Sequence, residues 1–202
     1  LISSDILNVI THVGIQSAHF VTLSFGSVLI QDLSMRKPGL VERVVMAGGI
    51  FRGNFLIKSF VHLARFFNLF LSYPQMYRAF SYLLMPKPRH QLSRRVYQIH
   101  SQKISNKEYL KWLGLYSTFF LTLKRFNNQK IDFPGLVVMG EDDYVFLSAA
   151  RRFSKKQPQV HLEVISKAGH ICNIDNAAAF NEIVLKFLDK NRSKTTSTSL
   201  AI

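Results

Sequence analysis

This 202-residue sequence contains a serine, Ser24, and two residues of the types that can activate a serine as a nucleophile, Asp143 and His170. A serine hydroxyl is a weak nucleophile at neutral pH, so it needs a histidine to accept its proton. That histidine in turn needs a carboxylate that fixes its tautomer and stabilises its charged form. The set therefore predicts nucleophilic catalysis at a serine, on the condition that the fold brings the three side chains together.

Four short apolar runs predict buried β-strands, and the segments between them read as helices. The predicted strands cover residues 19–23, 44–47, 136–139 and 160–165. In the closing segment, Phe180, Val184 and Phe187 recur at the spacing of one helix face. Strands that are apolar on both faces and alternate with helices predict an α/β fold with a mostly parallel sheet flanked by helices. Function in such sheets gathers at the carboxyl ends of the strands, which is where the three candidate residues fall.

Three stretches of the sequence resemble the α/β-hydrolase superfamily: HFVTLSFGSVLIQDLSMRKPGLVERVVMAGG, PGLVVMGEDDYVF and VHLEVISKAGHICNID. Together they cover most of residues 5–50 and 132–190. The resemblance implies that Ser24 is the nucleophile on a tight strand-to-helix turn, Asp143 the triad acid and His170 the general base. It also implies that the backbone N–H of Phe25 donates to the oxyanion. A hydrolase of this type needs no cofactor and no metal ion.

The sequence departs from the family pattern at two places. The family turn is usually Gly-x-Ser-x-Gly, but here Thr22 stands at the first glycine, while Gly26 matches the second. The family also places earlier strands, and the loop that supplies a second oxyanion donor, before the helix with which this chain begins. We therefore expect the 202 residues to be the carboxy-terminal portion of a longer enzyme, and the strand at 19–23 to have an open edge.

The middle of the chain carries almost all of the net charge. The sequence has 26 Lys and Arg residues against 12 Asp and Glu residues, which gives a net charge of +14. Between Arg52 and Lys130 there are fourteen bases and a single acid, Glu108. The same segment is rich in Phe and Tyr. In the family that the sequence resembles, a helical cap often covers the active site at this place in the chain, so the resemblance implies an apolar pocket above Ser24 with a cationic outer face.

The resemblance also predicts the domain organisation, because the family often carries a helical cap between its third-last and second-last strands. We expect a core at 1–50 and 126–190, a helical cap at 51–125 and a disordered tail at 191–202.

The expected function is a serine hydrolase, similar to esterases, lipases or thioesterases, acting through an acyl-enzyme. Its partner would be a small-molecule ester or thioester with an apolar acyl part. The basic rim would attract anionic substrates or an anionic membrane surface, although the cap aromatics could also simply pack together beneath solvated lysines. The bases and aromatics come without a nucleic-acid motif, which argues against a nucleic-acid partner.

Other functions stay open at this point: a catalytically silent binding module of the same fold, an acyltransferase or lyase, or a basic lipid-binding protein. One cysteine, Cys172, excludes an intramolecular disulfide and favours a reducing compartment, the cytoplasm. The apolar runs are too short or too charged to span a bilayer.

Overall fold

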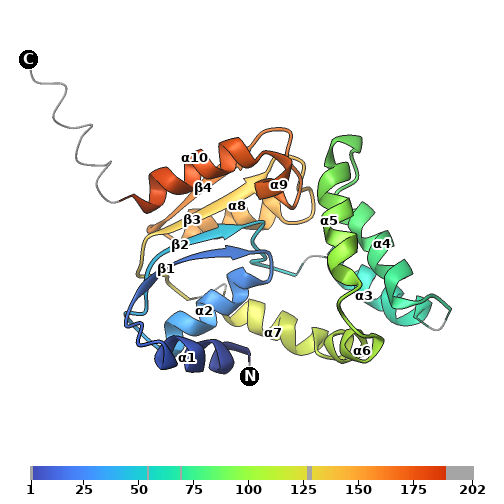
Figure 1. The fold of residues 1–202 in the computed structure, drawn as a ribbon, viewed down its shortest axis with the longest axis horizontal. Coiled ribbons are helices and arrows are strands. Elements are labelled where there is room, and N and C mark those ends of the chain that lie inside the picture. Colours follow the sequence, from blue (N-terminus) through green and yellow to red (C-terminus); the bar gives the residue numbers. More distant parts are fainter. Residues whose placement is uncertain (1, 54, 69, 127–128, 190–202) are drawn as a thin grey trace, which may run out of the picture.

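The computed structural model describes residues 2–53, 55–68, 70–126 and 129–189, so the tail expected to be disordered (191–202) lies outside the described residues. A single four-stranded parallel sheet, in the order β1-β2-β3-β4, forms the centre of the fold (Figure 1). The strands are β1 (Ala18–Leu23), β2 (Val41–Ala47), β3 (Gly135–Gly140) and β4 (Val160–Ile165). The sequence-based prediction of an α/β fold with a parallel sheet is confirmed.

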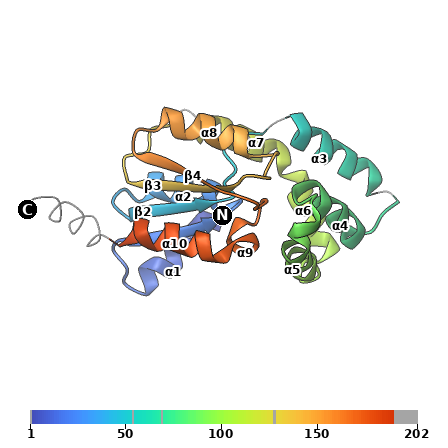
Figure 2. The same cartoon turned by 90° about the horizontal axis from the view of Figure 1, so that it is seen from above.

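Helices cover both faces of this sheet, as the two views show (Figure 1, Figure 2). One face, with Val44 and Met46 of β2, shares a core with helices α2 and α8; the other, with Val45, packs against α9 and α10. Their bounds are α2 (Gly26–Arg36), α8 (Leu147–Lys156), α9 (Cys172–Asp175) and α10 (Ala177–Leu188). The first helix, α1 (Ile2–His12), contacts α2. Alternate residues of β2 thus point into two different apolar cores, which explains its continuous apolar sequence.

Strand β1 differs from the expectation that it is buried on both faces. Val21 and Leu23 are about half exposed, at 52% and 50%. They pair with β2 residues on the face that α10 covers, but the main contact of α10 with the sheet is at β4, at the opposite edge from β1. Among the described strands, β1 pairs with β2 alone, so it forms an edge of the sheet.

A helical segment lies between β2 and β3 in the chain. Its elements are α3 (Phe55–Phe67), α4 (Tyr73–Leu84), the 3-10 helix η1 (Pro88–His90), α5 (Gln91–Ser101), α6 (Asn106–Gly114) and α7 (Tyr116–Phe126). Helices α3 to α6 lie to one side of the sheet, beyond the carboxyl ends of its strands (Figure 2). Helix α7 runs back to contact α2. Within the described part of the chain, no helix has the length and apolarity to cross a membrane.

Proline residues in this segment lie where helices begin and end. Pro74 lies in the first turn of α4, which starts behind a capping box formed by Ser72 and Gln75. Helix α4 ends at Leu84, and Pro88 starts η1. The chain therefore changes direction at the sites where a proline cannot continue a helix.

Candidate active site

Ser24 occupies a sharp turn between the end of β1 and the start of α2. Its backbone φ is +47°, a conformation that residues other than glycine rarely adopt. The Ser24 N–H donates to the carbonyl of Ala47 at 2.8 Å, and the Ser27 hydroxyl donates to the Ser24 carbonyl at 2.7 Å. These bonds hold the strained backbone in place and expose the Ser24 hydroxyl at the end of the sheet, as in a nucleophile elbow.

The threonine that replaces the first glycine of the family pattern fits this turn. An added Cβ on Gly26 would lie 3.0 Å from the Cβ of Thr22, so the side chain of Thr22 occupies the available space. The Thr22 hydroxyl donates to the carbonyl of Val45 at 3.0 Å. Position 22 therefore carries a side chain where the family pattern has none, and Gly26 leaves the room for it. The turn forms with one glycine instead of two.

Ser24, His170 and Asp143 form one chain of hydrogen-bonding contacts. The Ser24 Oγ lies 3.0 Å from His170 Nε2, and His170 Nδ1 lies 2.8 Å from Asp143 Oδ2. Asp143 is fully buried, and its other oxygen, Oδ1, accepts the Phe146 N–H at 3.0 Å. When Nδ1 donates to the carboxylate, Nε2 is left as an acceptor for the serine proton. The structure thus brings together the three residues that the sequence singled out.

Known proteins share this order of site residues along the chain. The serine turn follows one strand, and the acid and the histidine follow the last two strands. A sequence model of the alpha/beta hydrolase family matches residues 2–183. The chain belongs to the alpha/beta hydrolase family. The matched region includes the serine turn, the helical segment and both strands that precede Asp143 and His170.

Solved structures show the same fold. An esterase from Exiguobacterium antarcticum superposes with a TM-score of 0.70 at 16% identity, over 92% of this chain and 71% of that one. A 2-hydroxy-6-oxo-6-phenylhexa-2,4-dienoate hydrolase from Rhodococcus sp. strain RHA1 gives 0.72 at 15% identity, over 92% and 69%.

Curated relatives are matched over less of their length. A 2-hydroxy-6-oxononadienedioate/2-hydroxy-6-oxononatrienedioate hydrolase from a Pseudomonas species is 24% identical over 89% of this chain and 66% of its own. A Bacillus subtilis protein, named provisionally as a 2-succinyl-6-hydroxy-2,4-cyclohexadiene-1-carboxylate synthase, is 33% identical over 60 residues. That match covers 30% of this chain and 22% of the relative. The chain therefore spans at most about two thirds of these relatives.

Phe25 directly follows Ser24 and precedes the first residue of α2. Among the described residues, its backbone N–H donates no hydrogen bond, so it is free to donate to a ligand. Its ring contacts Trp112 of α6 and Phe119 of α7, with ring centroids 6.0 Å and 5.5 Å apart. The residue thus joins the serine turn to the helical segment.

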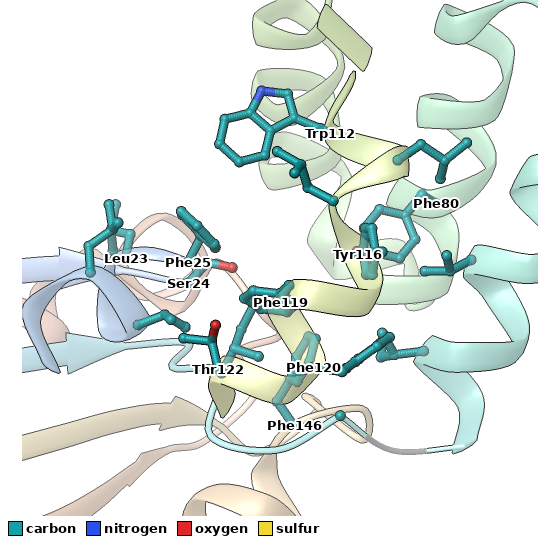
Figure 3. A pocket seen from close by; sticks show the side chains of 18 of the residues that line it. Leu23, Ser24, Phe25, Phe80, Trp112, Tyr116, Phe119, Phe120, Thr122 and Phe146 are labelled. Atoms are coloured by element: carbon teal, nitrogen blue, oxygen red, sulfur yellow. The ribbon is translucent and has the colours of Figure 1, made fainter. Parts of the chain in front are cut away.

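A large apolar cavity opens over Ser24 and His170. Its volume is about 1140 Å³, and helices α4, α6 and α7 close it on the side away from the sheet. Figure 3 shows the aromatic side chains that line it, among them Phe25, Phe80, Tyr116, Phe119, Phe120 and Phe146. Cations also line it, namely Arg36, Arg52, Lys111 and Arg125. The arrangement suits a ligand that places an apolar group next to the serine hydroxyl.

Tyrosine hydroxyls near this cavity remain neutral. Burial raises the pKa of Tyr73 to about 12, and the neighbouring Tyr77 and Tyr109 add to the shift. Burial also raises the pKa of Tyr97 well above its ordinary value. The aromatic wall therefore carries no negative charge near neutral pH.

A cluster centred on Asp142, which the sequence did not identify, ties the helical segment to the sheet. The Asp142 carboxylate is bound by Lys87, by Arg89 Nε at 2.8 Å and Nη2 at 2.6 Å, and by His90 Nε2 at 3.2 Å. Burial acts to raise the pKa of Asp142, but the hydrogen bonds and charges of Lys87 and Arg89 outweigh it, so the pKa is lowered. Asp142 is adjacent to Asp143, so the cluster fixes the turn that carries the proposed triad acid.

A second polar contact lies on the other side of His170. Asp175 of α9 accepts the Gly169 N–H at 2.7 Å and the hydroxyl of Ser93 of α5. An added Cβ on Gly169 would lie 2.9 Å from the His90 ring, so the loop before His170 passes close to η1, directly before α5. The described residues contain no group of three or more His, Cys, Asp or Glu side chains that could hold a metal ion.

Proposed function

We propose that this alpha/beta hydrolase is a serine hydrolase that cleaves a carboxylic ester or thioester with an apolar acyl group. The observation that carries the proposal is the hydrogen-bonded chain from Ser24 through His170 to Asp143, which opens into an apolar cavity. We propose these three residues as the catalytic triad and the Phe25 N–H as one oxyanion donor. The helical segment, residues 51–125, would act as a cap that excludes water from the reaction.

In the proposed reaction the Ser24 Oγ attacks the carbonyl carbon while its proton passes to His170 Nε2. The negative charge on the carbonyl oxygen is stabilised by the Phe25 N–H and the amino end of α2. The tetrahedral intermediate collapses to an acyl-enzyme, and His170 gives its proton to the leaving alkoxide or thiolate. Water, deprotonated by His170, then attacks the acyl-enzyme, and His170 returns the proton to the Ser24 Oγ as the acid leaves. Asp143 stays ionised throughout and orients the imidazole.

The names of the similar proteins cover an esterase, two hydrolases of dienoate substrates and, among the solved structures, an enol-lactonase from Burkholderia xenovorans LB400. All of these substrates present a carbonyl carbon to a nucleophile. The alternatives within the same fold are an acyltransferase or lyase, and a binding module without catalysis.

Labelling with a fluorophosphonate tests the proposal, since this reagent reacts with an activated serine. The wild-type protein should be labelled, Ser24→Ala should not, and the exposed Ser148→Ala variant should be labelled like the wild type. A wild-type protein that takes no label would support the silent binding module instead. Turnover of a p-nitrophenyl ester with and without an added alcohol acceptor then separates a hydrolase from an acyltransferase.

We further propose a peripheral contact with an anionic membrane through the basic helical segment, in a cytoplasmic setting that suits the free Cys172 thiol. Phe55 and Phe70 are 85% and 73% exposed, close in sequence to the cations Lys58 and Arg65. Exposed aromatic rings and cations on the same segment are typical of surfaces that insert shallowly among anionic lipids. Co-sedimentation with phosphatidylglycerol vesicles tests this contact: Phe55→Ser/Phe70→Ser should reduce it, and binding that is unchanged in this variant would argue against it.

A further inference from the structure

A second cavity, of about 690 Å³, lies between α3 and α7, and five of the residues that line it are cations. Lys58, Arg65 and His62 come from α3, and Lys124 comes from α7. The loop after β2 adds Arg52, and the last turn of α8 adds Lys156. Five cationic side chains and one histidine therefore surround a single hollow.

Carboxylates that would neutralise this hollow are missing from the elements that build it. The sequences of α3, α7 and α8 contain no Asp or Glu. Within the part of the chain that the structure describes, no ion pair involves Arg52, Lys58, Arg65, Lys124 or Lys156. Like charges gathered in a concave surface repel one another, so a bound anion would stabilise this region.

Two of the cations are held in position by other contacts. The Lys58 ammonium lies 5.6 Å from the centroid of the Phe120 ring, and the Arg65 Nη2 donates to the Leu113 carbonyl at 3.0 Å. A cation fixed in this way loses less conformational freedom when it binds an anion. The hollow is thus partly arranged for binding before a ligand arrives.

The cationic hollow adjoins the cavity over Ser24. Both are lined by Arg52, Gly53, Val61, Tyr116 and Phe120. An added Cβ on Gly53 would lie 2.3 Å from the Phe120 ring, so the backbone here comes very close to the shared wall. A ligand with an apolar part and a charged part could therefore occupy both spaces.

We propose that the second cavity is a phosphate-binding site. Several cations around one hollow match a group with two or more negative charges, and guanidinium groups such as those of Arg52 and Arg65 can bind two phosphate oxygens at once. The phosphate belongs to a soluble ester or thioester whose acyl part enters the cavity over Ser24, or to the headgroup of an anionic lipid. The link to the acyl cavity rests on the proposed hydrolase function, whereas the binding of phosphate does not.

Calorimetric titration with inorganic pyrophosphate tests the site. The test variant is Lys58→Gln/Lys124→Gln/Lys156→Gln, three residues that line the second cavity and not the first. The matched control is Lys103→Gln/Lys107→Gln/Lys186→Gln, which removes the same charge from exposed positions elsewhere. We expect affinity for pyrophosphate to fall by about tenfold or more in the test variant and to stay near the wild-type value in the control. Circular dichroism and the thermal midpoint check that both variants are folded.

Vesicles of phosphatidylcholine with phosphatidylglycerol identify the source of the phosphate. Pyrophosphate binding without vesicle binding indicates a soluble phosphorylated ligand. Vesicle binding that pyrophosphate displaces, and that the test variant loses, indicates a lipid headgroup. Equal losses in the two triple variants, or no binding of either probe to the wild type, would overturn the proposal. Fluorophosphonate labelling of Ser24 is independent of both probes, so failure of the phosphate site and failure of the hydrolase are told apart.

Discussion

Gly48 and His170 are in direct contact at the carboxyl end of the sheet. An added Cβ on Gly48 would lie 2.5 Å from the His170 carbonyl oxygen and 3.4 Å from the ring atoms Cε1 and Nδ1. The residue before Gly48, Ala47, accepts the Ser24 N–H at 2.8 Å. The end of β2 therefore supports both the proposed nucleophile and the proposed base, which explains how two residues 146 positions apart in the chain keep hydrogen-bonding distance.

Gly48→Ala should reduce activity and stability together. The φ of Gly48 is +54°, so any side chain there is strained, and the new methyl group would also displace His170. We expect a loss of about 1–3 kcal/mol in the free energy of unfolding and a fall in kcat of about 100-fold from the moved imidazole. Urea unfolding and ester turnover measure the two effects.

The matched control for this variant is Gly39→Ala. Gly39 has a φ of +82° and no heavy atom within 4 Å of an added Cβ. An alanine there has the same backbone strain as at Gly48, but its methyl group touches no other residue. Its turnover should stay at the wild-type level. Equal losses of kcat in the two variants would contradict the role of Gly48 in placing His170.

Asp142→Asn should loosen the attachment of the helical segment to the sheet. The substitution removes the negative charge that Lys87 and Arg89 share, and it leaves the fully buried His90 beside a neutral amide. We expect the free energy of unfolding to fall by about 2–4 kcal/mol in a urea titration. Asp32→Asn is the control, because it breaks a more exposed ion pair with Arg36 one helical turn away, which is worth less than about 1 kcal/mol.

Acid should weaken the same attachment. The pKa of Asp142 is lowered in the folded protein, so its stabilising effect is complete above the ordinary aspartate pKa of about 4 and is lost as pH falls through the lowered value. The free energy of unfolding should therefore decline more steeply with acidification in the wild type than in Asp142→Asn. Parallel slopes for the two proteins between about pH 5 and about pH 3 would show that Asp142 makes no such contribution.

The sequence could predict the fold and the meeting of Ser24 with His170 because both depend on local patterns. Short apolar runs predict parallel strands, and the carboxyl ends of parallel strands lie at one edge. The Asp142 cluster could not be predicted in this way, because its partners at Lys87 and Arg89 reach it only through the folding of the helical segment. The exposure of Val21 was missed for a similar reason. An apolar sequence predicts a buried strand, but it does not show whether a helix covers that strand in the folded protein.

Cys172 should resist alkylation in the native protein. Its thiol is fully buried, and burial, together with the charge of Asp143, raises its pKa to about 12. The thiolate is the reactive form, so iodoacetamide at about pH 8 should modify the protein in guanidinium chloride but not in buffer.

Above the ordinary thiol pKa of about 8.5, the Cys172 thiol ionises in the unfolded chain but not in the folded one, so the free energy of unfolding should decline as pH rises. Alkylation of the native protein, detected by mass spectrometry, would contradict this burial.

The serine turn offers a double-mutant test of how Thr22 replaces a glycine. Gly26→Ala places a methyl group 3.0 Å from the Thr22 Cβ, so one of the two side chains must give way by a few tenths of an ångström, and we expect this to draw the Ser24 hydroxyl away from His170. Thr22→Gly removes the obstacle, although it also removes the hydrogen bond to Val45. We expect Gly26→Ala to lower turnover by about 10- to 100-fold and Thr22→Gly/Gly26→Ala to recover part of it. A coupling free energy of about 1 kcal/mol or more between the two substitutions, measured from kcat/KM, would show that the two side chains compete for one space. Purely additive effects would mean instead that Gly26 is required for its backbone and not for the room it leaves to Thr22.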